Sequence, residues 1–237
     1  MDSQKSLSIY IPLYNEEEGV ENLSIKLKLV EKELGVVSKF KIILIDDGST
    51  DNTLKKLHHF FSAEKYKILS HKENKNLGGF LKTALSDCET EYISFLDSDC
   101  SYSPQLLVSM FKKSLEGFQI VNASPYHPNG NVKDVGEIRL FLSKSINYIY
   151  GIILKRKIYT TSSICKIYET ELAKKINITR DNFVAITELF TKSLTLTNKI
   201  YEYPCELKPR EYGKSKMNIF SNIFDHIKYL FHLYKFI

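Results

Sequence analysis

Short apolar runs alternate with helix-like segments over the first 120 residues of this chain. The runs that we expect to form strands are 7–12, 40–46, 66–70, 92–96 and 118–124. The helical patterns cover 16–34, a segment capped near Ser49 or Asp51, 77–85, and a segment from about Ser103. Strands separated by helices of this length require right-handed crossovers and hence a mainly parallel sheet. The sequence therefore predicts an α/β, Rossmann-like fold flanked by helices.

Polar residues follow three of these expected strands. They are residues 12–16, 46–49 and 97–99. Open α/β sheets bind ligands at the carboxyl edge, because the loops that follow the strands meet there. Asp97 and Asp99 stand two residues apart, a spacing that lets two carboxylates share a hard cation such as Mg²⁺ or Mn²⁺. Taken alone, such a pair is more often a solvated turn or a helix cap.

The charge of the chain is divided unevenly. Residues 1–120 hold 15 Lys against 18 acids, a net charge of −3, whereas residues 121–237 hold 18 basic against 10 acidic residues, a net charge of +8. The second half is therefore expected to meet an anionic group, either a phosphate-bearing substrate or an anionic membrane. No nucleic-acid partner is expected, because the basic residues do not cluster with aromatic platforms in a recognisable motif.

Cysteine spacing and the N-terminus indicate where the chain is found. The four cysteines are widely spaced and include no C-x-x-C pair, so we expect free thiols in a reducing compartment. The N-terminus shows neither a basic region nor a long apolar region of a secretory signal. No run reaches the ~18 apolar residues of a spanning helix. These features predict a cytoplasmic protein.

Four motifs occur in a characteristic order: IPLYNEEE (11–18), LIDDGSTDNT (44–53), NKNLGGFLKTAL (74–85) and FLDSDCSYSP (95–104). Together they resemble the donor-binding half of family 2 glycosyltransferases with the GT-A fold. Later segments are similar to the polyprenyl-phosphate sugar synthases, the dolichyl-phosphate mannose synthase-like branch. These segments are SPYHPNG (124–130), TTSSICKIYE (160–169), ITELF (186–190), YEYP (201–204) and YGKSKM (212–217). The resemblance implies one GT-A domain over 1–216, with a nucleotide-sugar-binding half (1–123) and an acceptor half (124–216).

The resemblance also implies a role for individual residues. Those of the donor pocket would be Pro12, Tyr14, Asn15, Glu16, Asp46, Asp47, Gly78, Asp97 and Ser98. Asp46 and Asp47 would contact the base and the ribose, and Gly78 would let a ligand approach the backbone closely. Asp97 and Asp99 would hold Mg²⁺ or Mn²⁺ against the diphosphate. The catalytic residues would be Asp99, Glu188, Arg139, Arg210 and Lys214.

The expected activity is metal-dependent, inverting transfer of a sugar from a nucleoside diphosphate sugar. If the acceptor is polyprenyl phosphate, no strong base is needed, and Arg139, Arg210 and Lys214 would position its phosphate. If the acceptor is a glycan hydroxyl, Glu188 is the candidate base, although a helix-surface role suits it nearly as well. A nucleotidyltransferase and a non-catalytic module that binds sugar nucleotides or membranes are the other classes. The Gly-rich loop that a nucleotidyltransferase places after its first strand is absent.

The tail from 217 to 237 predicts an amphipathic helix. Its apolar stripe comprises Phe220, Ile223, Phe224, Ile227, Leu230, Phe231 and Tyr234. Such a stripe either completes the core or lies in a membrane interface. A second amphipathic helix, expected at about 137–157, is its candidate partner. Peripheral contact with the cytoplasmic face of a membrane is therefore expected.

Overall fold

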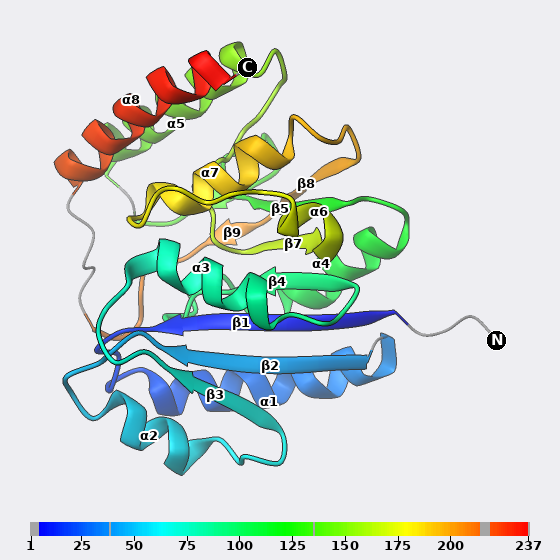
Figure 1. Cartoon of the computed structure of the whole chain (residues 1–237), viewed down its shortest axis with the longest axis vertical. Coiled ribbons are helices and arrows are strands. Elements are labelled where there is room, and N and C mark those ends of the chain that lie inside the picture. Colours follow the sequence, from blue (N-terminus) through cyan, green and yellow to red (C-terminus); the bar gives the residue numbers. More distant parts are fainter. Residues whose placement is uncertain (1–4, 38, 135, 214–218, 237) are drawn as a thin grey trace.

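The computed structural model describes residues 5–37, 39–134, 136–213 and 219–236 (Figure 1). The strands are β1 (Ser6–Leu13), β2 (Lys39–Asp46), β3 (Tyr66–Ser70), β4 (Tyr92–Phe95), β5 (Ile120–Ser124), β6 (Asn131–Val132), β7 (Lys166–Glu169), β8 (Ile200–Pro204) and β9 (Glu206–Leu207). The helices are α1 (Val20–Val37), α2 (Thr53–Phe60), α3 (Asn76–Asp87), α4 (Leu106–Leu115), α5 (Glu137–Ile153), α6 (Thr170–Lys174), α7 (Val184–Ser193) and α8 (Ile219–Phe236). This is the expected α/β arrangement, a mainly parallel sheet flanked by helices.

One large sheet organises the described part of the chain. Its seven strands lie in the order β3-β2-β1-β4-β7-β5-β8, and β6 pairs with β9 in a second, two-stranded sheet. All neighbours in the large sheet are parallel except β7, which runs antiparallel to both β4 and β5. The carboxyl ends of β1, β2 and β3 point to the same edge (Figure 1). The antiparallel insertion of β7 between β4 and β5 was not predicted from the sequence.

The alternation of side chains along the strands creates two cores. Leu7, Ile9 and Ile11 of β1 are fully buried on the face that α1 covers, whereas Tyr10 packs on the opposite face with Ile43. Successive residues of a strand point to opposite faces, so a run buried on both faces must be continuously apolar. The second core includes α3 and α7, and all ten residues of α7 are buried. The apolar runs therefore form a sheet covered on both faces.

Two helix starts differ from the expectation. The first helix begins at Val20 rather than at residue 16, because residues 14–19 form a loop. Asn15 in this loop has a φ of 50°, and the Glu16 N–H donates to Thr53 Oγ1 at 2.7 Å. The fourth helix begins at Leu106, and Ser103 does not cap it with its side chain: the hydroxyl contacts the Gln105 side chain instead.

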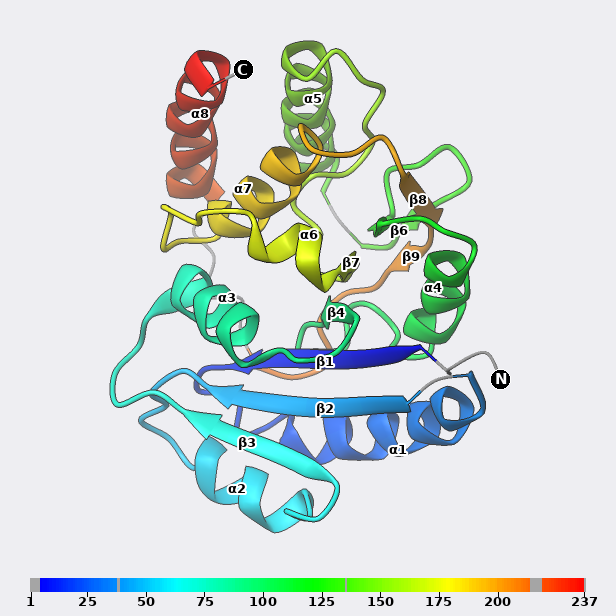
Figure 2. The same cartoon turned by 45° about the vertical axis from the view of Figure 1, so that its right-hand side comes forward.

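The C-terminal helix α8 stands beside α5 and against α7 (Figure 2). Among its described side chains, those of His226, Tyr229, Leu230 and Leu233 are buried, and they pack with Tyr150 of α5 and Val184 of α7. Most of the stripe predicted to be buried or interfacial is exposed, including Phe224, Ile227, Phe231 and Tyr234. The helix therefore completes a small core with one face and leaves an aromatic face uncovered.

Candidate active site

Asp97 and Asp99 lie in the loop that follows β4, at the carboxyl edge of the sheet. The Asp99 Oδ1 atom accepts a hydrogen bond from the Ser101 N–H at 2.9 Å, which holds the loop in a tight turn. The next residue, Cys100, has a φ of 56°. The Asp97 Oδ1 atom is buried and has no hydrogen-bond partner among the described residues. The loop therefore contains a carboxylate oxygen, Asp97 Oδ1, that accepts no hydrogen bond from the described residues.

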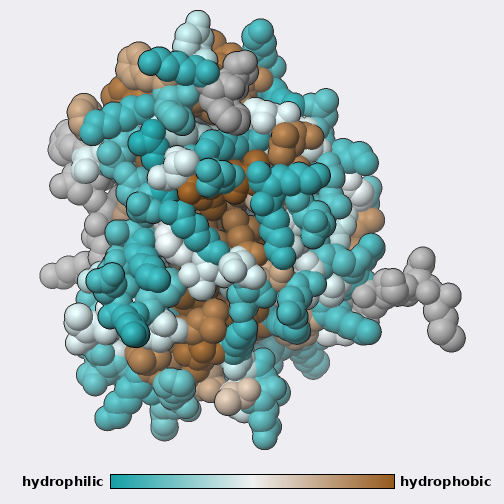
Figure 3. Space-filling model, viewed as in Figure 1, coloured by the Kyte–Doolittle hydropathy of each residue, from teal (hydrophilic) through white to brown (hydrophobic). Residues whose placement is uncertain are grey.

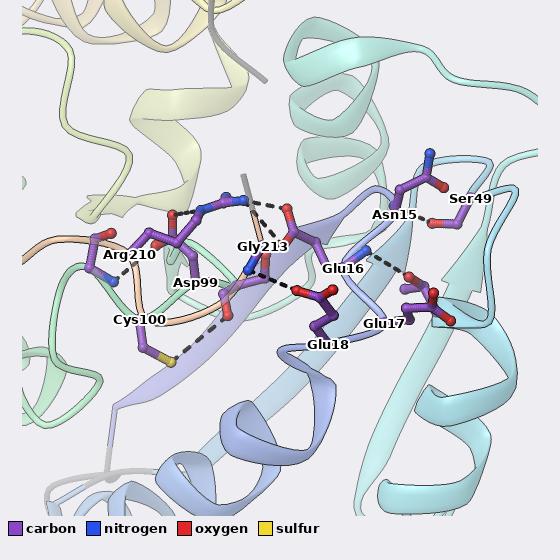
Figure 4. A network of polar contacts seen from close by, with 12 residues as sticks. Asn15, Glu16, Glu17, Glu18, Ser49, Asp99, Cys100, Arg210 and Gly213 are labelled. Carbon is purple, nitrogen blue, oxygen red and sulfur yellow. Dashed lines mark hydrogen bonds and ion pairs between the residues drawn. The ribbon is translucent and has the colours of Figure 1, made fainter. Parts of the chain in front are cut away.

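Arg210 joins this loop to the loop that follows β1 (Figure 4). Its Nε donates to Asp99 Oδ2 at 2.9 Å, and its Nη2 donates to Glu16 Oε1 at 3.2 Å. Asp99 and Glu16 are both largely buried, so solvent screens these ion pairs only partly. Two predicted donor-site loops and a predicted catalytic arginine thus meet in one cluster, which we call the Asp97–Arg210 cluster: Glu16, Asp97, Asp99 and Arg210.

The electrostatics of the two aspartates diverge. Burial raises the pKa of Asp97 well above its usual range, and the nearby charge of Asp99 adds to the rise. Burial also opposes ionisation of Asp99, but hydrogen bonds from Asp97 and Ser101 and the charge of Arg210 outweigh it, so the pKa of Asp99 is lowered. The surroundings therefore oppose ionisation of Asp97 and favour ionisation of Asp99.

These residues fit a divalent cation held jointly with a substrate. The described residues include no group of three or more His, Cys, Asp or Glu side chains arranged to hold a metal ion. Two carboxylates are nevertheless a suitable protein contribution for Mg²⁺ or Mn²⁺, which usually keeps water and takes further oxygen ligands from a substrate phosphate. The unused Asp97 Oδ1 and the ionised Asp99 supply this donor set.

Asp46 is the last residue of β2 and Asp47 follows it, and both are almost completely buried, at 1% and 4% exposed. The Asp47 Oδ1 atom lies 2.6 Å from His71 Nδ1 and accepts from the Lys75 N–H at 2.9 Å. The Asp46 Oδ2 atom accepts from the Ser70 hydroxyl at 3.2 Å, whereas its Oδ1 has no partner in the described chain. Asp47 is therefore held by internal contacts, and Asp46 retains one oxygen for a ligand.

Gly78 is needed for a close approach of the chain's own backbone. Its N–H donates to the Asp181 carbonyl at 2.9 Å, and a Cβ atom at this position would lie 2.1 Å from the Arg180 carbonyl oxygen. The expectation that this glycine makes room for a ligand is thus corrected, because the segment 180–181 occupies the space. Gly78 still lies on the α3 turn that follows Lys75, the residue bonded to Asp47.

Glu188 is fully buried in α7. Its carboxylate accepts from the Thr179 and Arg180 N–H groups, from the Thr179 hydroxyl and from Lys192 Nζ, which lies 2.6 Å away. Burial opposes its ionisation, but these donors outweigh burial and lower the pKa of Glu188. The alternative of a helix-surface glutamate is wrong, and the burial does not suit a base that must reach an acceptor hydroxyl.

The remaining predicted residues are only partly described. Pro12 and Tyr14 are half-buried at the end of β1 and just beyond it, and Ser98 is half-buried between the two aspartates. Arg139 lies in the first turn of α5, and the contacts of its side chain are outside the described structure. Lys214 and the adjacent Ser215 and Lys216 lie outside the described residues.

Three polar residues, Lys166, which is buried, and His71 and Glu202, which are half-buried, were missed from the sequence. His71 contacts both Asp47 and the Thr83 hydroxyl. Glu202 accepts from the N–H groups of Tyr159 and Thr160, and Lys166 donates to the Thr161 carbonyl at 3.1 Å. Burial lowers the pKa of Lys166 to about 7. In the sequence these three residues look like ordinary surface residues. Only their hydrogen-bond partners, which are distant in sequence or lie on loops, show that they have an internal role.

Comparison with known proteins settles the family. The model of the family described as "Glycosyl transferase family 2" matches residues 8–176, which is more than half of the chain. The chain belongs to glycosyl transferase family 2. Membership in this family speaks against the nucleotidyltransferase alternative.

Two curated relatives span most of this chain but extend beyond it. The chain is 23% identical over 231 residues to a dolichol-phosphate mannosyltransferase of Pyrococcus furiosus, a match that covers 97% of this chain and 64% of the relative. It is 29% identical over 215 residues to a chondroitin synthase of Escherichia coli, covering 89% of this chain and 27% of the relative. The chain therefore spans less than two thirds of either protein.

Solved structures confirm the fold. The glucosyl-3-phosphoglycerate synthase of Mycobacterium tuberculosis, in complex with Mn²⁺, UDP-glucose and phosphoglyceric acid, superposes with a TM-score of 0.75 at 16% identity, over 98% of this chain and 80% of that one. Residues 1–349 of S. aureus TarS superpose with a TM-score of 0.61 at 21% identity, over 95% of this chain and 65% of that one. In the part of the chain that the structure describes, no helix is long and apolar enough to cross a membrane.

Proposed function

We propose that this chain is a metal-dependent, inverting glycosyltransferase that moves a sugar from a nucleoside diphosphate sugar to polyprenyl phosphate. The observation that carries the proposal is the Asp97–Arg210 cluster, in which two strand-end loops and Arg210 converge at the carboxyl edge of the sheet. Ligands of open α/β sheets bind at this edge. The 1–123 half would bind the donor and the 124–216 half the acceptor.

The chemistry of the donor side follows from the carboxylates of the cluster. Asp97 and Asp99 would hold Mg²⁺ or Mn²⁺, which when bound neutralises charge that develops on the leaving diphosphate. Asp46, with its free Oδ1, would accept from the base or ribose of the nucleotide. Support comes from the synthase whose complex contains Mn²⁺ and UDP-glucose. The acceptor oxygen would attack the anomeric carbon from the side opposite the diphosphate.

Two observations favour an acceptor that is already anionic. Glu188, the only residue for which we expected a base role, is inaccessible and fully bonded. A phosphate oxygen needs no base, and a guanidinium such as that of Arg210 recognises it well. The similarity to a dolichol-phosphate mannosyltransferase supports the same choice. The alternative is a transferase that extends a glycan on a sugar hydroxyl, in keeping with the similarity to a chondroitin synthase.

The exposed faces of α5 and α8 support delivery of a lipid acceptor. Their exposed large apolar side chains are Ile138, Phe141, Tyr148, Ile149, Ile152, Phe224, Ile227, Phe231 and Tyr234. Figure 3 shows hydrophobic side chains among polar ones at the end of the molecule where α8 lies. Lys228 stands over the Phe224 ring at 4.3 Å. An aromatic face with adjacent cations suits the interface of an anionic bilayer, here the cytoplasmic face of a membrane.

A donor panel tests the proposed function. UDP-, GDP-, ADP-, CDP- and dTDP-sugars are each incubated with the protein, Mn²⁺ or Mg²⁺ and either undecaprenyl phosphate or soluble sugars, and the products are identified by mass spectrometry. We expect one class of nucleotide to be released in step with glycosylated lipid phosphate, and chelation to stop the release. Product on soluble sugars alone would support the glycan-extending alternative. Release of sugar 1-phosphate, with the nucleoside monophosphate left on the acceptor, would contradict sugar transfer.

A further inference from the structure

We propose that Glu188 is a positioning residue for the donor pocket, which it supports through residues 179–181 and the first turn of α3. The proposal rests on the donor pocket described above and replaces the role of a base. The Glu188 carboxylate has no exposed surface and accepts from four donors. Burying a charge is costly unless it is paired and hydrogen-bonded, so we expect this carboxylate to hold in place the segment that supplies its donors.

The first step joins Glu188 to the segment 177–180. Its carboxylate accepts from the Thr179 N–H at 2.9 Å, from the Thr179 hydroxyl at 2.7 Å and from the Arg180 N–H at 2.8 Å. Lys192, one turn further along α7, neutralises Glu188 and donates to the Asn177 carbonyl at 2.9 Å. An ionised carboxylate accepts all of these bonds at once, which no neutral side chain of similar size does. Glu188 and Lys192 thus hold residues 177–180, which have no regular secondary structure, against the fully buried helix α7.

The second step joins that segment to α3. The Asp181 carbonyl accepts from the Gly78 N–H at 2.9 Å, and the Arg180 carbonyl lies where a Cβ of Gly78 would stand. This contact has no free space, so a displacement of residues 180–181 must move the first turn of α3 or break the bond. Lys82 of α3 also pairs with the Asp181 carboxylate at 2.9 Å.

The third step joins α3 to the donor pocket. Lys75, the residue before α3, donates its N–H to Asp47 Oδ1 at 2.9 Å. Gly48 follows Asp47 with a φ of 72°, and a Cβ there would lie 2.5 Å from the Glu73 carbonyl carbon. The segment 73–78 is therefore held between the β2 loop on one side and residues 180–181 on the other. Contacts run without interruption from Glu188 to the loop that carries Asp46 and Asp47.

A positioning role and a base role predict opposite kinetic effects. Loss of a base lowers kcat by about 10²-fold or more and leaves donor affinity intact. Loss of a positioning residue weakens donor binding, and its effect on turnover shrinks once the donor is saturating. The pH profile of kcat changes only in the first case.

The test uses Glu188→Gln in the full chain, with Glu171→Gln on the exposed surface of α6 as the matched control. Affinity for the nucleoside diphosphate that the wild-type protein binds best is measured by calorimetry with Mn²⁺. We expect about tenfold weaker binding in Glu188→Gln, no change in the control, and kcat within about threefold of the wild-type value at saturating donor, with an unchanged pH profile. Unaltered affinity together with a collapse of kcat would overturn the proposal.

A milder variant keeps the test decisive if Glu188→Gln does not fold. Thr179→Val removes only the hydroxyl that donates to Glu188 at 2.7 Å and preserves the shape of the side chain. We expect about threefold weaker nucleotide binding, because one bond to the ionised carboxylate is lost while those from the Thr179 and Arg180 N–H groups remain. Thr179→Val that folds and binds as the wild-type protein does would contradict the proposal. A wild-type protein that binds no nucleoside diphosphate would instead contradict the proposed function itself.

Discussion

Arg210 Nε donates to Asp99 Oδ2 at 2.9 Å across 111 positions of sequence. The same guanidinium reaches Glu16 on the β1 loop, so one cation joins Glu16 to Asp99, a proposed metal ligand. A divalent cation bound at Asp99 must compete with this ion pair. Arg210 is thereby a candidate to turn from Asp99 toward a phosphate group during the reaction cycle.

Asp99→Asn is expected to leave the fold intact and to lower transfer by at least ~10²-fold, on the scale of losing a major electrostatic contact in the transition state. The amide keeps the size of the carboxylate but removes the charge that pairs with Arg210. Turnover of purified variants and their circular dichroism spectra provide the measurement. Glu89→Gln, on the exposed loop before β4, is the matched control. Near-normal turnover in a folded Asp99→Asn protein would exclude Asp99 from the site.

Arg210→Gln is expected to raise the affinity for Mn²⁺ in the absence of any nucleotide, because Asp99 and Glu16 lose their competing cation. We expect an increase of about fivefold, which corresponds to a charge interaction of ~1 kcal/mol. Electron paramagnetic resonance of free Mn²⁺ measures it directly, and Arg210→Lys, which keeps the charge, should change it less. Weaker Mn²⁺ binding in Arg210→Gln would show that the guanidinium does not compete with the metal.

Asp47→Ala is expected to destabilise the protein as well as to weaken donor binding. It removes the partner of His71 and the acceptor of the Lys75 N–H. Leaving the His71 side chain and the Lys75 N–H without their acceptor costs about 3 kcal/mol in total, or roughly 6–12 °C in melting temperature for a chain of this length. Asp181→Ala, which removes an exposed pair with Lys82, serves as the comparison in thermal unfolding. Equal melting temperatures for the two variants would contradict this account of Asp47.

Stability is expected to fall as the pH decreases from 7 to 5. Burial between α5 and α8 lowers the pKa of His226 from 6.5 to about 4. The unfolded chain therefore binds a proton that the folded chain excludes in this range, so this stability is complete above pH 6.5 and is lost toward pH 4. From pH 7 to 5 the loss is about 2 kcal/mol. His226→Gln should melt with a weaker pH dependence, and an unchanged dependence would contradict the assignment.

The two faces of α8 are expected to respond differently to polar substitution. Phe231→Ser lies on the exposed face and Leu233→Ser on the buried face. We expect Phe231→Ser to keep its melting temperature and to bind anionic liposomes less, and Leu233→Ser to lose stability by about 2–4 kcal/mol. Vesicle co-sedimentation and thermal unfolding measure the two effects. Undiminished liposome binding by Phe231→Ser would remove this residue from the proposed membrane contact.

Most of the fold was predictable because local patterns determine it. The runs before Asp46 and Asp97, IILI and YISFL, are apolar except for Ser94, and only a sheet covered on both faces buries such runs. The position of β7 was not predictable, because its first residue, Lys166, is a charged residue that a buried strand does not normally contain. Its burial depends on hydrogen bonds to backbone carbonyl groups, which the sequence does not show. The sequence also left open which side of α8 faces the core, since aromatic residues occur on both of its faces.

The candidate site was predictable only in part. The Asp97 and Asp99 spacing and the motif around Arg210 identified residues that the structure brings together. The contacts of Glu188 and Gly78 were not predictable, because both depend on the segment 179–181, which has no regular pattern. A carboxylate that serves as an internal acceptor and one that serves as a base look alike in sequence.

The central claim is transfer of a sugar to a lipid phosphate, and an acceptor competition tests it most directly. The wild-type protein is supplied with its preferred nucleoside diphosphate sugar, Mn²⁺, and equal concentrations of undecaprenyl phosphate and soluble oligosaccharides, and the products are separated and weighed by mass spectrometry. The account predicts that the lipid phosphate gains the mass of one sugar, and that Asp99→Asn abolishes this product. A product confined to the hydroxyl groups of the oligosaccharides would contradict it.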